Sequence, residues 1–425
     1  MNGSRMTPET AVADTPHEML PRKRAEAAPP ARVALICDYL EERWPSMDLF
    51  GDMLFETFTA LAGSSIHAEQ LRPALRPRFS KLPGPTGMLW NADRLWNRFY
   101  EYPAWLAGQA HRFDLFHLMD HSYAQLLLKL PAERTIVTCH DLDTFQCLLE
   151  PTADPRPRWF RAMARRTLTG FLRAAHVICV SSFTRDKILQ HGLVTPDRIS
   201  VIHPGADPAF FSSADLARQA GNPVLSKTRS YLLHVGSTIR RKRIDVLLRV
   251  FASLAGDFPD LQLVRVGGLT AEQSRLAEEL GIASRIVTAS NLTKPELADV
   301  YRQAILLLQT SDAEGFGLPL IEAMACGCPV VASDIPALRE AGLTASEYCP
   351  VGQIDAWTGR VSNLLRERVQ SPEGWAQRRQ KARVHASAYT WTENAKQTIS
   401  VYDRVRDPRP SGGKPVTDIA RKPVL

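Results

Sequence analysis

The amino-acid sequence predicts an α/β protein built from two doubly wound domains. The chain has 425 residues, which is too long for one ordinary hydrophobic core and suits two domains. Short runs of β-branched and other apolar residues alternate with longer stretches of helical pattern. Because the apolar runs are continuous, they predict parallel strands buried on both faces. The runs come in two series, which implies two parallel sheets covered by helices.

The predicted strands are separated by helical stretches in both series. The first series is RVALICDYL (32–40), FDLFHLMD (113–120), RTIVTCHD (134–141), AHVICVSS (175–182) and RISVIHPGAD (198–207). The second series is SYLLHVGS (230–237), LQLVRVGG (261–268), SRIVTAS (284–290), AILLLQTS (304–311) and CPVVASD (328–334). In such sheets ligands bind beyond the carboxyl ends of the strands, so the polar residues after each strand are the first candidates for a site.

Composition divides the chain into segments. We expect a disordered tail (1–30), a first Rossmann-like domain (31–208), a second (229–390), a C-terminal helix packing back on the first domain (391–406) and a second disordered tail (407–425). Both tails lack apolar periodicity. The domain boundary is expected near residues 208–228, where SSADLARQAGNP loses the strand–helix pattern.

Charge and cysteine usage narrow the function classes. The net charge of +7 suits anionic partners, but no recognisable nucleic-acid-binding motif is present, so we expect no nucleic-acid partner. The seven cysteines are odd in number, scattered and without a C-x-x-C pair, which argues against a disulfide framework or a zinc site. No apolar run reaches the length of a membrane span, and no signal-peptide layout is present, so we expect a cytoplasmic protein. A nicotinamide-dependent oxidoreductase is disfavoured, because no G-x-G-x-x-G follows the first strand of either domain.

One stretch concentrates candidate site chemistry. AILLLQTSDAEGFGLPLIEAMACG reads as strand, loop and helix, with Pro319 suited to the first helical turn and Gly327 to the helix end. The loop residues are Gly315, Phe316, Gly317 and Leu318. Their backbone N–H groups and the helix dipole favour an anion or an array of hydroxyl oxygens.

Two glutamates flank this loop. Glu314 precedes it, and Glu322 is expected in the first helical turn. Carboxylates accept hydrogen bonds from paired sugar hydroxyls, so one glutamate is suited to a hexose and the other to a ribose. The alternative is structural, because a glutamate in a first helical turn is favoured by the dipole alone and Gly-x-Gly is common in loops. The complete string is far more specific than a lone glycine-rich loop.

This segment resembles the signature of retaining glycosyltransferases of the family-4 type. Their pattern, E-G-F-G-L-P-x-x-E-A-M-A-x-G-x-P-V-V-A-S, has a glutamate at both positions matched by Glu314 and Glu322. The resemblance extends over about residues 114–390. It implies the GT-B fold, in which two Rossmann-like domains face each other across a cleft, the first binding the acceptor and the second the sugar nucleotide.

The resemblance also implies an activity. A hexose would pass from a nucleoside-diphosphate sugar (a UDP- or GDP-sugar) to a hydroxyl acceptor, a glycan or lipid-linked glycan, with retention of anomeric configuration. The usual role of the family is surface polysaccharide or glycolipid assembly. The resemblance implies no cofactor and no metal, and no Asp-x-Asp motif precedes the donor loop. The alternative is a sugar-nucleotide-binding protein on the same scaffold without transfer activity.

Further site residues follow from the resemblance. HVGSTIRRKRIDVLLRVF (234–251) resembles V-G-x-x-x-x-R-K-N-x-x-x-L-L-x-A-F, so Arg241 and Lys242 would bind the donor diphosphate, and Gly236 would belong to the donor site. Two cations in such a loop suit a leaving group that gains negative charge. The alternative is a basic, solvated loop, since Arg240 and Arg243 flank the pair.

The first domain contributes one more candidate. VTCHDLDTF (137–145) resembles the family's strand that ends in His-Asp, so His140 would face the donor sugar; alternatively it is a polar strand end. The resemblance therefore gives Glu314, His140, Lys242 and Arg241 as catalytic residues. It gives as donor-binding residues Gly236, Arg241, Lys242, Gly315, Phe316, Gly317, Leu318 and Glu322. The nucleobase would rest on backbone near residues 287–292.

The acceptor side departs from the family pattern. Many members carry a Gly-Gly loop after the first strand, whereas this chain has CDYLEERWPSMDLFGDML (37–54), with Gly51 as the one candidate for that role. The aromatic stretch 88–106 suits an acceptor platform, a membrane-facing patch or, by preference, a helix that buries Leu89, Leu95, Trp96 and Phe99. The basic amphipathic stretch 155–176 suits either an ordinary surface helix or peripheral contact with the inner face of a membrane.

Overall fold

The computed structural model describes residue 3 and residues 30–61, 65–82, 85–212, 222, 224–228 and 230–407. The two predicted tails (1–30 and 407–425) lie almost wholly outside this range. The predicted boundary segment (208–228) lies partly outside it.

The first domain contains a six-stranded parallel sheet. Its strands are β1 (Ala31–Ile36), β2 (Ile66–Leu71), β3 (Leu115–Leu118), β4 (Thr135–Cys139), β5 (His176–Cys179) and β6 (Ile199–Val201), in the order β2-β1-β3-β4-β5-β6. The sequence analysis missed β2. This strand, IHAEQL, pairs only with β1 at the sheet edge, and it carries polar side chains in place of a continuous apolar run.

The second domain repeats this architecture. Its strands are β7 (Tyr231–Val235), β8 (Gln262–Val266), β9 (Ile286–Ala289), β10 (Leu306–Gln309), β11 (Val330–Ser333) and β12 (Glu347–Cys349), in the order β12-β11-β10-β7-β8-β9. The chain proceeds outward from β7 to β9 and then returns to β10 on the other side of β7. The strand order therefore reverses between β7 and β10, where doubly wound sheets bind ligands. The predicted α/β fold with two doubly wound domains is confirmed.

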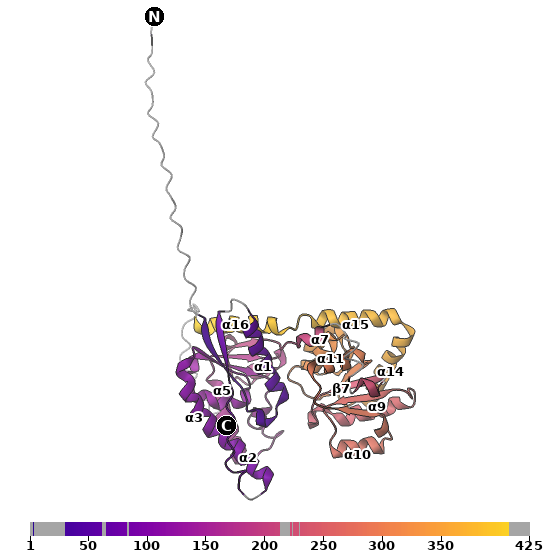
Figure 1. Cartoon of the computed structure of the whole chain (residues 1–425), viewed down its shortest axis with the longest axis horizontal. Helices are drawn as coiled ribbons and strands as arrows, with labels where there is room; N and C mark the ends of the chain where they lie inside the picture. Colours follow the sequence, from indigo (N-terminus) through magenta and orange to yellow (C-terminus); the bar gives the residue numbers. More distant parts are fainter. Residues whose placement is uncertain are drawn as a thin grey trace.

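Helices cover both sheets (Figure 1). In the first domain they are α1 (Pro45–Ala60), α2 (Thr86–Trp96), α3 (Tyr102–Gln109), α4 (Gln146–Leu149), α5 (Arg158–Leu172) and α6 (Ser182–Gln190). The connection and second domain contain α7 (Pro208–Phe211), α9 (Ile244–Ala255), α10 (Ala271–Glu279), α11 (Lys294–Gln303), α12 (Leu318–Ala325), α13 (Pro336–Gly342), α14 (Ile354–Gln370) and α15 (Pro372–Ala386). The last described helix is α16 (Trp391–Arg406).

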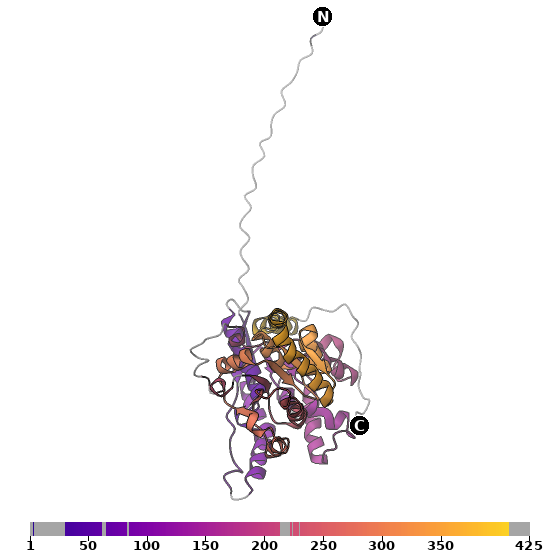
Figure 2. The same ribbon diagram turned by 90° about the vertical axis from the view of Figure 1, so that its right-hand side faces the viewer.

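The C-terminal helices connect the two domains. In Figure 1, α15 lies over the second domain and α16 continues along the same edge over the first. Figure 2, viewed from the side of the second domain, shows the two domains one behind the other. The hydroxyl of Tyr402 in α16 lies 2.7 Å from Nδ1 of His117 in β3. Gly205 has no room for a side chain, because a Cβ there would lie 2.2 Å from the backbone nitrogen of Trp391.

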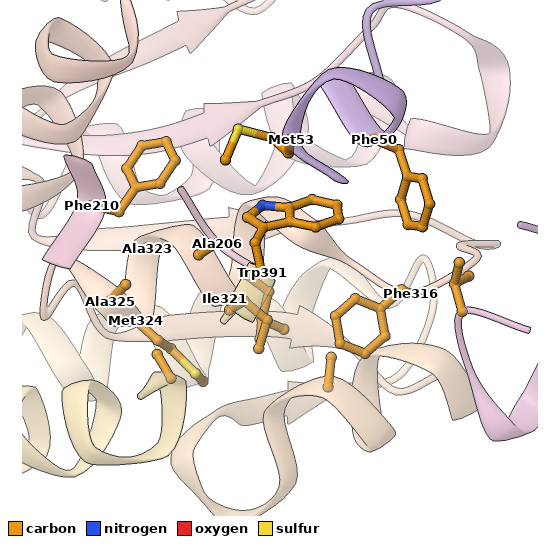
Figure 3. Packing of buried hydrophobic residues seen from close by; sticks show 14 of the residues in the cluster. Phe50, Met53, Ala206, Phe210, Phe316, Ile321, Ala323, Met324, Ala325 and Trp391 are labelled. Atoms are coloured by element: carbon orange, nitrogen blue, oxygen red, sulfur yellow. The ribbon is translucent and has the colours of Figure 1, made fainter. Parts of the chain in front are cut away.

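A shared hydrophobic cluster joins the domains at this edge. Figure 3 shows Trp391 between Phe50 and Met53 of α1 and Phe316 and Ile321 of the second domain. The rings of Phe50 and Trp391 meet edge-on, with centroids 5.2 Å apart. All of these side chains are buried, so apolar contact holds the two sheets in a fixed relation on one side of the cleft.

The expected burial of Leu95 and Trp96 is wrong. Both side chains are 36% exposed, and the buried residues of this helical region are Asp93 and Asn97. The Asp93 carboxylate accepts hydrogen bonds from the consecutive backbone N–H groups of residues 78–80. These polar groups satisfy a loop backbone on the inner face, so Leu95 and Trp96 turn outward, whereas Leu89 and Phe99 are half-buried.

Candidate active site in the cleft between the domains

The loops after β7 and β10 meet at the reversal of strand order. The backbone N–H of Asp312 donates to the carbonyl of Arg241 at 2.9 Å, and the Thr310 hydroxyl donates to the carbonyl of Lys242 at 3.0 Å. Gly236, which ends β7, has a φ of +152°, and a Cβ there would lie 3.5 Å from Cε of Lys242. This packing brings the predicted residues Gly236, Arg241 and Lys242 next to the loop that carries Glu314.

Glu314 is held by three hydrogen bonds to one oxygen. Its Oε1 accepts from Lys242 Nζ at 2.6 Å, Gln309 Nε2 at 2.6 Å and the Ser311 hydroxyl at 2.7 Å. Burial by itself raises the pKa of Glu314, but the ammonium of Lys242 and these hydrogen bonds lower it below the ordinary value. Glu314 is therefore a fixed carboxylate, and its Oε2 takes no part in these three contacts.

Arg241 crosses the cleft to the first domain. Its Nη1 lies 3.3 Å from Oδ2 of Asp141 and 2.9 Å from Oδ2 of Asp143, both in the loop after β4. Arg241 is thus a cation at the junction of the two domains, bound by carboxylates of the opposite domain. The sequence analysis did not single out either aspartate. Their signal was present in HDLD, directly after a predicted strand.

The glycine-rich loop opens α12 as predicted. Gly317 is the residue before the helix, with a φ of +111°, and Pro319 lies in the first turn. Gly327 follows the helix with a φ of +71°. A Cβ on Gly315 would lie 2.3 Å from the carbonyl oxygen of His140, so this loop packs directly on the first domain. Glycine is required there by the close approach of two backbones.

Phe316 and Leu318, two of the predicted donor-binding residues, differ in which of their groups can reach a ligand. The ring of Phe316 is buried and stacks on His203, with centroids 5.1 Å apart, so its side chain points into the interface between the domains. Only the backbone of Phe316 remains available to a ligand in the cleft. Leu318, the first residue of α12, is half-buried and presents an N–H group at the helix start.

His140 lies at the end of β4 and faces this loop. Its Nε2 lies 2.8 Å from the carbonyl oxygen of Met119. Because a carbonyl only accepts, Nε2 carries the proton and Nδ1 is an acceptor. Burial, as the largest cause, lowers the pKa of His140, so the ring is neutral at pH 7.

Glu322 occupies the second turn of α12, not the predicted first turn, which contains no acidic residue. It is buried, and its Oε2 accepts a hydrogen bond from the Tyr301 hydroxyl at 2.9 Å. Burial raises the pKa of Glu322 to about 7. The structural alternative, in which the helix dipole favours a glutamate in the first turn, therefore does not apply to Glu322.

Arg265 supports the loop after β7 from within the core, although the sequence analysis did not identify it. It is fully buried in β8, and burial lowers its pKa to about 10. Its Nη2 donates to the carbonyl of Ser237 at 2.8 Å, directly after Gly236. The available signal was a lone arginine inside the apolar run LQLVRVGG.

Gly51 does not form a ligand-binding loop. It lies within α1, and a Cβ there would lie 3.0 Å from Sγ of Cys37. The family's Gly-Gly loop is thus replaced in this chain by a short 3-10 turn (Leu40–Glu42) and the start of α1. The site for the acceptor must accordingly be built from other side chains.

A cavity of about 540 Å³ opens beside the cleft in the first domain. His140, Asp141, Asp143 and Arg241 line it, together with side chains of α2 and the turn that follows it, of α5, and of the segments after β1 and β3. The cavity therefore lies next to Arg241, which pairs with Asp141 and Asp143 across the cleft. The geometry therefore places two basic side chains of the second domain, Arg241 and Lys242, close to a cavity in the first.

Two family patterns match the chain. That of "Glycosyl transferases group 1" matches residues 218–382, and that of "Glycosyltransferase Family 4" matches residues 57–210. The chain belongs to the GT4-type glycosyltransferases. A D-inositol 3-phosphate glycosyltransferase of Catenulispora acidiphila is 32% identical over 220 residues, 49% of this chain and 52% of that protein. One of Mycobacterium tuberculosis is 31% identical over 253 residues, 55% of this chain and 50% of that protein. The chain spans about half the length of the curated relatives it matches.

Solved structures confirm the GT-B fold of this glycosyltransferase. Sucrose-phosphate synthase of Thermosynechococcus elongatus superposes with a TM-score of 0.67 at 22% identity, covering 88% of this chain and 99% of that one. HepE of Anabaena, in complex with UDP and glucose, gives 0.66 at 16% identity over 88% and 99%. WaaG, a glycosyltransferase of lipopolysaccharide biosynthesis, gives 0.64 at 17% identity over 90% and 100%.

The described ranges offer neither a membrane-spanning helix nor a cluster of metal ligands. No helix in these ranges has the length and apolar character needed to cross a membrane. Within the same ranges, no group of three or more His, Cys, Asp or Glu side chains is arranged to hold a metal ion. The seven cysteines are all described, buried and unpaired with one another.

Proposed function

We propose that this protein transfers a hexose from a UDP- or GDP-sugar to a hydroxyl acceptor, with retention of anomeric configuration and without a metal ion. The observation that carries the proposal is the buried Lys242–Glu314 pair at the reversal of strand order, next to the amide-lined start of α12. A cation beside a helix N-terminus suits a diphosphate, and a fixed carboxylate suits sugar hydroxyls.

Each residue has a role in this scheme. Arg241, Lys242 and the N–H groups of Gly317 and Leu318 stabilise the departing diphosphate, while Gly236 lets it approach the backbone. Glu314 accepts hydrogen bonds from the sugar through Oε2, since Oε1 already accepts three. Gly315 and Phe316 offer backbone to the sugar.

The first domain and α12 complete the scheme. His140 accepts a hydrogen bond from the donor sugar at Nδ1, and Glu322 binds the ribose. The bond between the anomeric carbon and the diphosphate oxygen breaks, and the bond to the acceptor oxygen forms on the same face. The acceptor's proton passes to the departing diphosphate.

The biological role that we propose is the assembly of surface polysaccharide or glycolipid, at the cytoplasmic face of a membrane. WaaG, by its title, takes part in lipopolysaccharide biosynthesis. HepE was solved with UDP and with UDP-glucose, which makes uridine sugars the first donors to test.

Thermal unfolding with a panel of UDP-, GDP-, ADP- and dTDP-sugars tests the donor site. A ligand at a hundred times its Kd adds roughly 2.7 kcal/mol to the free energy of unfolding. We expect one nucleotide class to raise Tm, and Lys242→Ala and Glu322→Ala to abolish that shift. Lys396→Ala, at an exposed position on α16, is the matched control and should retain it. No shift with any sugar nucleotide in the folded wild type would refute the proposal.

Turnover separates the enzyme from a non-catalytic binding protein. Release of nucleoside diphosphate, followed with the donor that shifts Tm, should require Arg241 and Lys242. The configuration of the product, read by NMR of the anomeric proton, should be that of the donor. A Tm shift without release of nucleoside diphosphate under any acceptor condition would favour the binding protein.

A further inference from the structure

We propose that the cavity of the first domain binds an acceptor with an uncharged, hydroxyl-bearing head, and that the apolar chain of this acceptor lies in a groove between α2 and α5. The inference rests on the proposed transfer function and adds the chemical class of the acceptor. We call the two parts the head cavity (the cavity of about 540 Å³ described above) and the chain groove.

The head cavity contains a buried polar group without a full set of partners. The side chain of Glu42 is completely buried, and its Oε2 pairs with Arg94 at 3.2 Å and Arg98 at 3.6 Å. Oε1 of Glu42 and Nε of Arg94 have no hydrogen-bond partner among the described residues. Glu42 is thus a buried carboxylate that two guanidinium groups already neutralise, so the charges on this side of the head cavity are paired within the protein.

Charge in the head cavity opposes an anionic head. Three guanidinium groups line it, and all three are engaged, with Glu42 in the case of Arg94 and Arg98 and with aspartates in the case of Arg241. The carboxylates that line it are Glu42, Asp120, Asp141 and Asp143. A phosphate bound there would lie among carboxylates, whereas hydroxyl groups would donate to them. The paired arginines and the carboxylates of the head cavity therefore favour an uncharged head.

The chain groove continues directly from the head cavity. Leu95, Phe99 and Met163 line both hollows, so they form one continuous surface. The other apolar side chains of the groove include Phe79, Trp96 and Tyr100. A head whose hydroxyl reaches Arg241 at one end of the cavity would thus direct its substituent along α2 and α5.

The groove is apolar surface without a cover in the described protein. Tyr100 is 62% exposed and Trp159, at the mouth of the head cavity, is 59% exposed. Exposed aromatic surface next to a substrate cavity indicates a ligand or a lipid surface. Arg158 and Arg166 are exposed on α5 at the same side, where cations favour an anionic lipid surface. An apolar alkyl or prenyl chain attached to the head is therefore the occupant that fits the chain groove.

Binding of n-octyl β-D-glucoside brominated on its chain tests the inference without requiring turnover. Bromine quenches the fluorescence of tryptophan at short range, and Trp96 lines the chain groove, in which the brominated chain would lie. We expect saturable quenching of the wild type below the micellar concentration. Because Met163 lines both hollows, Met163→Gln removes apolar contact with the chain and should raise the half-saturating concentration about tenfold or more. Leu95→Gln is a second variant at an exposed site. The control is Val384→Gln, a 62% exposed valine on α15, which should bind like the wild type.

Acceptor preference provides the second measurement. With the donor identified by Tm, the enzyme should extend octyl glucoside in preference to glucose, and glucose 6-phosphate should be the poorest acceptor. A dioleoylglycerol glucoside in phosphatidylglycerol vesicles shows whether the chain is taken from a bilayer or from solution. Equal use of glucose and octyl glucoside, or quenching that is the same in Met163→Gln and Val384→Gln, would overturn the inference. Donor binding would be intact in that case, whereas failure of the proposed function would appear as absent donor binding.

Discussion

Nζ of Lys242 lies 2.6 Å from Oε1 of Glu314, and this pair joins the loop after β7 to the loop after β10. The two side chains are 11% and 8% exposed. A buried pair of this kind gives little net stability, but the loss of one partner leaves an uncompensated buried charge.

The first prediction concerns this pair. Lys242→Met and Glu314→Gln should each lower the free energy of unfolding by about 3–5 kcal/mol, because each leaves one buried charge without its partner. The double variant should lose less than the sum of the two single losses, because it leaves neither charge. Urea unfolding of the two single variants and the double variant gives the coupling energy. Additive losses would show that the two side chains do not interact in solution.

The second prediction concerns Arg241, whose Nη1 lies 2.9 Å from Asp143 of the opposite domain. The donor diphosphate would compete with this carboxylate for the guanidinium. Because Asp143 is 64% exposed, the pair is weak, and Asp143→Asn should tighten UDP binding by roughly two- to fivefold in calorimetric titration. Asp186→Asn, which removes an exposed aspartate paired with Arg185 on α6, is the matched control. Weaker binding by Asp143→Asn would mean that the aspartate assists the donor.

The third prediction is a pH dependence at Glu322. Its pKa is raised from 4.5 to about 7 by burial, so its contribution to stability is fully present below pH 4.5 and is lost as pH rises through 7. Between pH 5 and pH 8.5 the wild type should therefore lose about 2–3 kcal/mol relative to Glu322→Gln, which keeps an acceptor for the Tyr301 hydroxyl. Urea unfolding of both proteins at the two pH values measures the difference. Parallel pH profiles would indicate that Glu322 ionises as it does in the unfolded chain.

The fourth prediction concerns Gly315, where a Cβ would lie 2.3 Å from the His140 carbonyl oxygen. Gly315→Ala should push the donor loop away from the first domain, reduce release of nucleoside diphosphate at least about tenfold, and increase the radius of gyration in X-ray scattering. Gly359→Ala, in α14 with open space around it, should leave both unchanged and raise stability by about 0.5–1 kcal/mol. An active, compact Gly315→Ala variant would contradict the close packing of loop and domain.

Local sequence was sufficient to predict ten of the twelve described strands and the loop that opens α12. The strands that it predicted are central or have apolar runs, as in LLHV of β7 and ILLL at β10. The strands that it missed, β2 and β12, lie at sheet edges, where one face is exposed or the strand is only three residues long. Burial on both faces produces a continuous apolar run, and an edge position removes that requirement.

The sequence by itself determined two doubly wound domains and the strand–loop–helix that carries Glu314, because periodicity, Pro319 and Gly327 act on neighbours along the chain. Only the tertiary structure decided that Arg241 meets Asp141 and Asp143 and that Leu95 and Trp96 face outward. Those contacts depend on strand order and on the docking of one domain against the other. Partners about a hundred residues apart leave no periodic trace in either segment.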